Sequence, residues 1–189
     1  MVSDEIRKFL GESSNYQQNL DAALHKAAFD GEFLALGANT QTHREDGTTP
    51  VHNASFHGPV DVMCALLKAH VKTDARGIHG TTPLHDAVYS GDLAATEALL
   101  AACAYTEATR SSGNTTPLHD ASYHGHMDII HALLKAHART DAGRKRSALP
   151  LNDAAFYKHT SAVHTLLEGG ADIEGRRHCG VRSLHDTVS

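Results

Sequence analysis

The stretch Thr116-Pro-Leu-His119 decides the fold, because the chain repeats it at a fixed interval. Close copies stand at Thr49-Pro-Val-His52 and Thr82-Pro-Leu-His85, and altered copies follow at Leu149-Pro-Leu-Asn152 and Ser183-Leu-His185. The prolines of the four full-length copies are residues 50, 83, 117 and 150, so the interval is 33, 34 and 33 residues. A fixed period of this length predicts a stack of structural repeats, each packed on its neighbours.

We call this four-residue stretch the repeat phrase. Each copy is followed by further residues of the same type at the same spacing. After His119 come a small residue, an aromatic residue and a glycine, and then an apolar helix: Ala121, Tyr123, Gly125, Ile129, Ile130, Leu133 and Leu134. The same frame gives Ala54, Phe56 and Gly58, then Ala87, Tyr89 and Gly91, then Ala154 and Phe156. This pattern resembles the ankyrin repeat, in which each unit is a β-turn plus two helices.

The resemblance covers roughly residue 21 to the end of the chain and implies an all-α ankyrin-repeat solenoid. Its units would be helix-turn-helix pairs joined by β-hairpin loops, about five repeats plus a partial sixth. The expected boundaries are 21–43 for a shortened first repeat, then 44–76, 77–109, 110–143, 144–176 and a partial 177–189. Residues 1–20 are expected to form an N-terminal capping helix or tail. Because the last unit is incomplete, we expect a fragment of a longer protein, with a natural end inside the half-repeat as the alternative.

Local residue types predict where the helices of one repeat begin and end. The Thr-Pro pairs predict helix starts, since proline suits the first turn and the threonine hydroxyl can cap it. Gly58, Gly91 and Gly125 are expected to end the inner helices in a left-handed conformation. Lys158 replaces that glycine in the fifth unit and should carry strain of about 1 kcal/mol. One extra residue near Ser111–Asn114 should lengthen one finger, the loop that connects consecutive repeats.

Composition narrows the class of protein. The formal charge of −5 argues against nucleic-acid binding, which needs a clustered basic surface. Three cysteines at unrelated spacings fit a reducing compartment, and neither a signal peptide nor a membrane span is apparent. We therefore expect a monomer that binds neither nucleic acid nor membrane. Its expected location is the cytoplasm, with the nucleus, or the host cytosol for a secreted effector, as alternatives.

No motif of an enzyme is present, and no phosphate-binding loop follows a strand. The chain has 16 histidines, but none stands with Cys or carboxylate partners at the spacing of a zinc site. The resemblance implies that His52, His85, His119 and His185 serve the structure by hydrogen bonding loop to helix. The sequence therefore predicts no catalytic residue, no cofactor and no metal.

The inner helices carry the candidate binding residues. Asp86, Asp120 and Asp153 each precede an aromatic residue by three positions, so the acidic and the aromatic side chain share a helix face. The resemblance implies that this face lines a concave groove, with the fingers beside it. The candidate partner-binding residues are Phe56, His57, Ile78, His79, Asp86, Tyr89, Asp120, Tyr123, His124, Asp153 and Phe156. Alternatively, the aromatic residues support the fingers and the aspartates favour the helix dipole.

These observations predict a non-catalytic protein–protein interaction module or scaffold. Its concave inner-helix face and hairpin fingers are expected to bind a partner protein through a basic or Arg-bearing segment. One alternative is that the array is the recognition arm of a larger protein, such as an enzyme, a ubiquitin-ligase substrate receptor or a translocated effector. A third hypothesis is a stack that responds to pH, because neutral phrase histidines that must take up protons would destabilise the fold toward pH 5.

Overall fold

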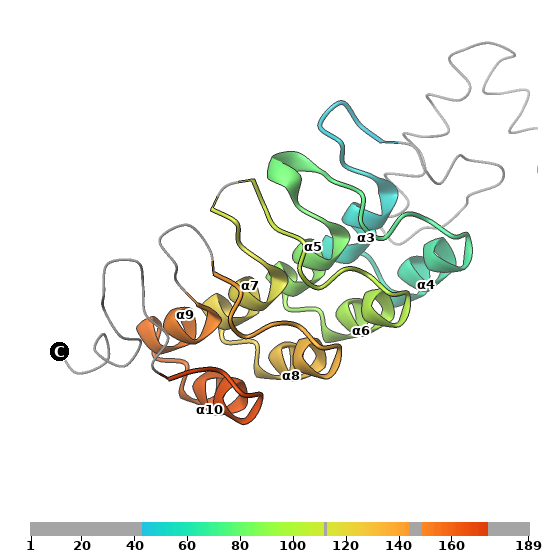
Figure 1. Ribbon diagram of the computed structural model, residues 1–189. Coiled ribbons are helices and arrows are strands. Elements are labelled where there is room, and N and C mark those ends of the chain that lie inside the picture. The colour runs from blue at the N-terminus through green and yellow to red at the C-terminus, as the bar shows by residue number, and fades with distance from the viewer. Residues whose placement is uncertain (1–42, 112, 144–148, 174–189) are drawn as a thin grey trace, which may run out of the picture.

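A computed structural model of the chain describes residues 43–111, 113–143 and 149–173, and within them it contains helices and no strand (Figure 1). The inner helices are α3 (Pro50–His57), α5 (Pro83–Ser90), α7 (Pro117–His124) and α9 (Pro150–Phe156). The outer helices are α4 (Val60–Lys68), α6 (Leu93–Ala101), α8 (Met127–Lys135) and α10 (Thr160–Glu168). A 3-10 turn, η1 (Ile78–Gly80), lies in one finger.

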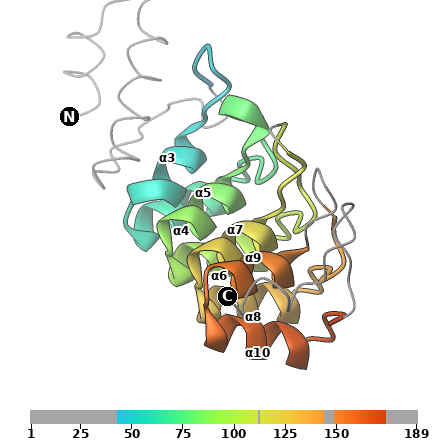
Figure 2. The ribbon, with the colours of Figure 1, turned by 90° about the vertical axis from the view of Figure 1, so that its left-hand side faces the viewer.

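The helices form two layers that run the length of the molecule. Each inner helix packs on the next, from α3 through α5 and α7 to α9, and the outer helices follow the same order beside them. Figures 1 and 2 show the two rows, with the fingers extending from the inner-helix side. The predicted all-α solenoid of helix pairs is therefore confirmed.

Small and branched residues fill the space between the repeats. One leucine of every outer helix and one alanine of every inner helix are fully buried at equivalent positions: Leu66, Leu99, Leu133, Leu166, Ala54, Ala87, Ala121 and Ala154. Their regular spacing follows from the sequence period, since a residue that packs against the neighbouring repeat recurs once per unit. The predicted units 1–20 and 177–189, and all of 21–43 except His43, lie outside the described residues.

The inner helices begin as the Thr-Pro pairs predict, and the phrase histidine secures each start. In α5, Nδ1 of His85 accepts a hydrogen bond from the Thr82 backbone N–H at 3.2 Å and lies 2.9 Å from the Thr82 hydroxyl. The proton then resides on Nε2, which donates to the Thr115 carbonyl of the next finger at 3.1 Å. His52 makes the equivalent contacts with Thr49 and Thr81. The expected structural role is thus confirmed for these two histidines, which bond one repeat to the next.

The ends of the inner helices follow the prediction at two glycines and depart from it at one. Gly91 and Gly125 are left-handed, with φ of 75° and 71°. Gly58 has φ of −79° and extended ψ, so the expectation of a left-handed residue there was wrong. The reason is Pro59, whose ring pushes the preceding residue toward extended conformations. Lys158 does adopt the left-handed conformation, with φ of 60°.

A backbone hydrogen bond closes each described finger at its base, and in the first finger the N–H of Arg44 donates to the Thr48 carbonyl at 2.9 Å. The N–H of Gly77 donates to the Thr81 carbonyl at 2.9 Å, which encloses a loop of constant size in the first two fingers. In the third finger, the N–H of Arg110 donates to the Thr115 carbonyl at 3.0 Å, so this loop is one residue longer, as predicted. The two fingers are joined by the N–H of Ser111, which donates to the His79 carbonyl at 2.8 Å.

Candidate functional site: an aromatic strip on the inner helices

A continuous series of aromatic side chains crosses the last turns of the four inner helices. We call it the aromatic strip; its members are Phe56, His57, Tyr89, Tyr123, His124, Phe156 and Tyr157. Each helix places its aromatic residue at the same register, so the repeat period alone aligns them along the solenoid. The strip includes six of the residues that the sequence predicted for partner binding.

Ring contacts join the strip across all three boundaries between repeats. The rings of Phe56 and Tyr89 stack with centroids 6.0 Å apart, and His124 meets Tyr89 edge to face at 4.9 Å. At the next boundary Tyr123 meets Tyr157 at 4.3 Å. Aromatic pairs at these separations favour one arrangement over others, so the rings hold one another in place. The surface is therefore preorganised.

The strip remains accessible to solvent although its rings touch. Tyr89 is 48% exposed, Tyr123 42% and Phe156 53%. Most large apolar side chains of the described residues lie in the core instead. Contiguous exposed apolar surface of this kind is typical of sites that another molecule covers.

The predicted acidic row lies beneath the strip and not beside it in solvent. Asp120 is 7% exposed and Asp153 is 2% exposed, whereas Asp86 is partly buried. The expectation of an exposed acidic row was therefore wrong. Helix spacing places aspartate and aromatic residue on one face, but the aspartates of the first helical turn are wholly or partly buried in the stack, whereas the aromatic residues of the last turn stay about half exposed.

The chain itself supplies a cation for one of these carboxylates, Asp120. Nη2 of Arg110, on the third finger, lies 2.8 Å from Oδ2 of Asp120. The Arg110 guanidinium carbon also lies 5.9 Å from the centroid of the Tyr89 ring, which is within cation–π range. An internal arginine thus occupies the position that the sequence assigned to an Arg-bearing partner.

Burial shifts the pKa values of groups beneath the strip and of His124 within it. It raises the pKa of Asp86 to about 7, with Arg110 opposing the rise and the Asp120 charge adding to it. Burial lowers the pKa of His85 to about 3, so this imidazole is neutral throughout the physiological range. Burial, followed by the charge of His126, also lowers the pKa of His124.

Two further histidines contact the preceding repeat next to the strip. Nε2 of His159 makes a 3.0 Å hydrogen bond with the Tyr123 carbonyl, and its ring lies against Gly125. A Cβ at Gly125 would come within 2.5 Å of the His159 ring, and one at Gly91 within 2.9 Å of His126. These glycines therefore provide both a left-handed turn and space for the next repeat's imidazole.

The finger residues Ile78 and His79 lie apart from the ring contacts of the strip. Ile78 is 49% exposed in η1, and His79 is exposed with φ of 56°. Both are thus available to a partner that reaches from the strip to the fingers. Sequence reasoning missed Tyr157 and Arg110, although Tyr157 has the same register as His57 and His124 and could have been found from the period.

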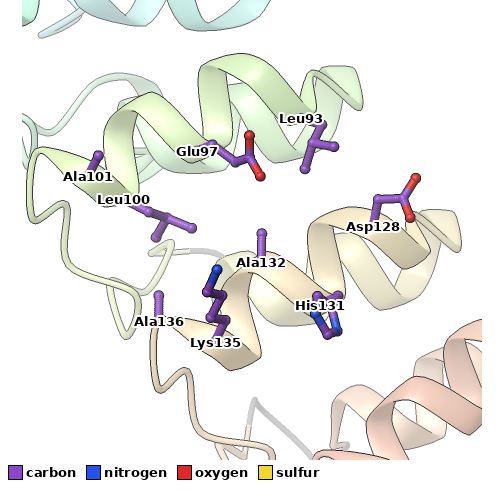
Figure 3. Close-up of a pocket in the computed structure, with 9 residues that line it drawn as sticks. All are labelled: Leu93, Glu97, Leu100, Ala101, Asp128, His131, Ala132, Lys135 and Ala136. Carbon is purple, nitrogen blue, oxygen red and sulfur yellow. The ribbon is translucent and has the colours of Figure 1, made fainter.

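A groove of about 510 Å³ lies between the outer helices α6 and α8 (Figure 3). Its apolar lining comes from Leu93 and Leu100 on α6 and from Ala132 on α8, and Glu97 and Lys135 place opposite charges at its sides. This mixture does not select one class of ligand. Sequence reasoning missed the groove because each of the two helices looks like an ordinary outer helix. The groove exists only where the two pack side by side.

The described residues hold no group of three His, Cys, Asp or Glu side chains placed to bind a metal ion. No helix in the same ranges has both the length and the apolar character required to cross a membrane.

The fold and its hydrogen bonds define the class of protein. It is a linear stack of helix pairs in which the histidine of the repeat phrase bonds one repeat to the next. A family model for ankyrin repeats matches residues 24–110 and 105–177, and the chain belongs to this family. Ankyrin repeats are generally protein–protein interaction modules and are typically non-catalytic. A search of curated proteins returned no match to the chain.

Proposed function

We propose that this protein is a non-catalytic interaction module whose aromatic strip, with the finger residues Ile78 and His79, binds an exposed segment of a partner protein. The observation that carries the proposal is the unbroken series of half-exposed rings across four repeats. Tyrosine and other rigid aromatic side chains dominate the energetics of protein interfaces. Because the rings already contact one another, binding orders few side chains and costs little entropy.

The strip favours a partner segment with apolar or aromatic side chains. The aspartates beneath it act as supports in this proposal, because Asp120 already pairs with Arg110 at 2.8 Å. The attraction of a basic segment, which the sequence suggested, therefore loses its main argument. We expect affinity to depend weakly on salt, as is usual where apolar contacts dominate over exposed charge pairs.

A quantitative pull-down from cell lysate tests the proposal with a matched control. The test chain carries Tyr89→Ser and Tyr123→Ser, and the control carries Tyr105→Ser in the turn after α6, where the tyrosine is 57% exposed. We expect the double variant to bind its partner at least about tenfold more weakly, equivalent to about 1.4 kcal/mol, and the control to bind normally. Equal loss in both chains, or retention by the double variant, would place the binding surface elsewhere.

A further inference from the structure

Two tyrosines of the aromatic strip carry hydroxyl groups that the described part of the chain does not use. Among the described residues, nothing forms a hydrogen bond with the hydroxyl of Tyr89 or of Tyr123, and both residues are nearly half exposed. Phe56 stacks on the Tyr89 ring, and the Arg110 guanidinium carbon lies 5.9 Å from the centroid of that ring. Neighbouring side chains thus hold the rings, while the hydroxyl groups are left to meet another molecule.

The polar groups near the strip favour a partner that accepts hydrogen bonds. A tyrosine hydroxyl can donate, and Arg110 brings a positive charge next to Tyr89. The acidic residues of the four inner helices are wholly or partly buried, so none of them is an exposed acceptor at this surface: Asp86, Asp120 and Asp153. A segment that offers acceptors and few donors is therefore complementary in charge to the strip.

A proline-rich segment in the polyproline II conformation has this property. Proline has no backbone N–H, and the carbonyl groups of a polyproline II helix make no internal hydrogen bond, so they are available to a donor. An α-helix satisfies its own backbone groups, and an extended strand presents donors as well as acceptors. Of the three backbone conformations, polyproline II fits the exposed hydroxyl groups best.

The spacing of the inner helices favours the same conformation. A polyproline II helix completes one turn in three residues, which is a length of about 9 Å. Helices packed side by side, as α3, α5, α7 and α9 are, lie about 8–10 Å apart. Every third residue of the segment would therefore meet the next inner helix, and about ten residues would span all four. A strand repeats its facing side chains after about 6.7 Å and falls out of register.

We propose that the aromatic strip binds a proline-rich segment of its partner in the polyproline II conformation. Prolines at every third position lie against the rings, and the hydroxyl groups of Tyr89 and Tyr123 donate hydrogen bonds to carbonyl groups of the segment. This inference rests on the proposed function, because it names the kind of segment that the same surface takes. Both sides are rigid before they meet, since the rings contact one another and proline fixes φ, so association orders few groups.

The first test is an NMR titration of the full chain with a blocked peptide of ten prolines, which is neutral and adopts polyproline II. We expect the ring signals of Tyr89 and Tyr123 to shift and to saturate. The signals of Tyr105, which is 57% exposed in the turn after α6, should stay constant. No shift at about 1 mM peptide, or an equal shift of Tyr105, would overturn the proposal.

Two further peptides of ten residues test the register. One has proline at every third position and the other at every second position, with alanine between the prolines. The first should bind at least about threefold more tightly although it contains fewer prolines, because its prolines recur with the period of the inner helices. Equal affinities, or tighter binding of the second peptide, would show that the repeats do not read every third residue and would contradict the proposal.

A conservative double variant tests the hydroxyl groups. Tyr89→Phe with Tyr123→Phe keeps both rings and their packing and removes only the two donors. We expect the affinity for the peptide of ten prolines to fall about tenfold, whereas Tyr105→Phe leaves the affinity unchanged. An unchanged affinity in the double variant would show that the hydroxyl groups do not bind the carbonyl groups of the peptide, and the proposal would fail.

The titrations and the pull-down can fail separately. If capture of a partner depends on Tyr89 and Tyr123 but the peptide of ten prolines does not bind, the proposed function stands and this inference falls. If the peptides bind with the expected pattern but the pull-down fails, the preference of the strip stands and the proposed function falls. A captured partner whose binding segment, mapped by truncation, contains no proline also overturns the inference, in favour of a helix or a strand.

Discussion

The phrase histidine acts as a structural linker at the scale of the single residue. In His85 the imidazole is fully buried, and each of its nitrogens makes a backbone hydrogen bond, one within the repeat and one to the next finger. Burial holds its pKa near 3, so it cannot exchange protons near neutral pH. A buried, neutral and doubly bonded imidazole suits neither acid–base catalysis at neutral pH nor metal binding.

Replacing His85 in two ways should separate its two hydrogen bonds. Asn152 shows that an amide can keep the first bond, since its Oδ1 accepts from the Leu149 N–H at 2.9 Å. We therefore expect His85→Asn to cost about 1–2 kcal/mol of unfolding free energy and His85→Ala about 3 kcal/mol, because alanine leaves more buried groups unpaired. Urea unfolding measures both values. Equal losses would show that the bond to Thr115 carries the whole effect.

Lys158 offers a gain in stability at a single position. Its φ of 60° is unfavourable for a residue with a Cβ and is natural for glycine. We expect Lys158→Gly to raise the unfolding free energy by about 1 kcal/mol, and Lys158→Ala, which keeps the Cβ, to give no gain. Thermal unfolding compares the two. A stabilising alanine variant would mean that the lysine side chain, and not the backbone, is the unfavourable feature.

At the scale of the element, the boundaries of the helices could be predicted because they depend on local residue types. Thr-Pro starts and the left-handed Gly91 and Gly125 are properties of a few adjacent residues. Gly58 is not left-handed as predicted, and the reason is also local, because Pro59 follows it in the sequence. The burial of Asp120 and Asp153 could not be predicted in this way, because it depends on parts of neighbouring repeats and fingers.

The same distinction applies to the candidate site. The aromatic register was predictable from the period, and it placed Tyr89, Tyr123 and Phe156 in one series. The pairing of Arg110 with Asp120 and Tyr89 was not, since a finger one residue longer than its neighbours sets where that arginine reaches.

The packing of His159 on Gly125 joins two elements and can be tested by a double-mutant cycle. Gly125→Ala adds a Cβ that meets the His159 ring at 2.5 Å and also sits at φ of 71°. We expect a loss of about 2–3 kcal/mol, of which about 1 kcal/mol comes from the backbone. In a chain that already carries Gly125→Ala, His159→Ala should cost less unfolding free energy than it does in the intact chain. Strict additivity in urea unfolding would contradict direct packing between them.

At the scale of the whole molecule, stability should respond to pH through two opposing groups of residues. His52 and His85 have pKa values lowered by burial, so they contribute stability above pH 6.5 that is lost as the pH falls below it. Asp86 has its pKa raised to about 7, so its unfavourable charge disappears as the pH falls through 7, which stabilises the fold. The destabilisation expected from the histidines is therefore partly masked.

Removing Asp86 should reveal the histidine effect. We expect Asp86→Asn to be more stable than the intact chain at pH 7.5 and to lose about 2 kcal/mol more between pH 7.5 and pH 5.5, from linkage to its shifted pKa. Urea unfolding at the two pH values measures the difference, with Asp74→Asn at an exposed turn as the control. Parallel changes in the intact and Asp86→Asn chains would contradict the assigned titration.

The solenoid brings four short helices into one extended surface, and the central claim is that a partner protein lies along it. Site-specific photo-crosslinking tests this most directly, with p-benzoylphenylalanine in place of Tyr123 or Phe156 on the strip, or of Tyr105 as the matched exposed position. The account predicts that both strip positions crosslink to the same protein in lysate and that the Tyr105 position does not. Crosslinks from Tyr105 alone, or from none of the three positions, would contradict it.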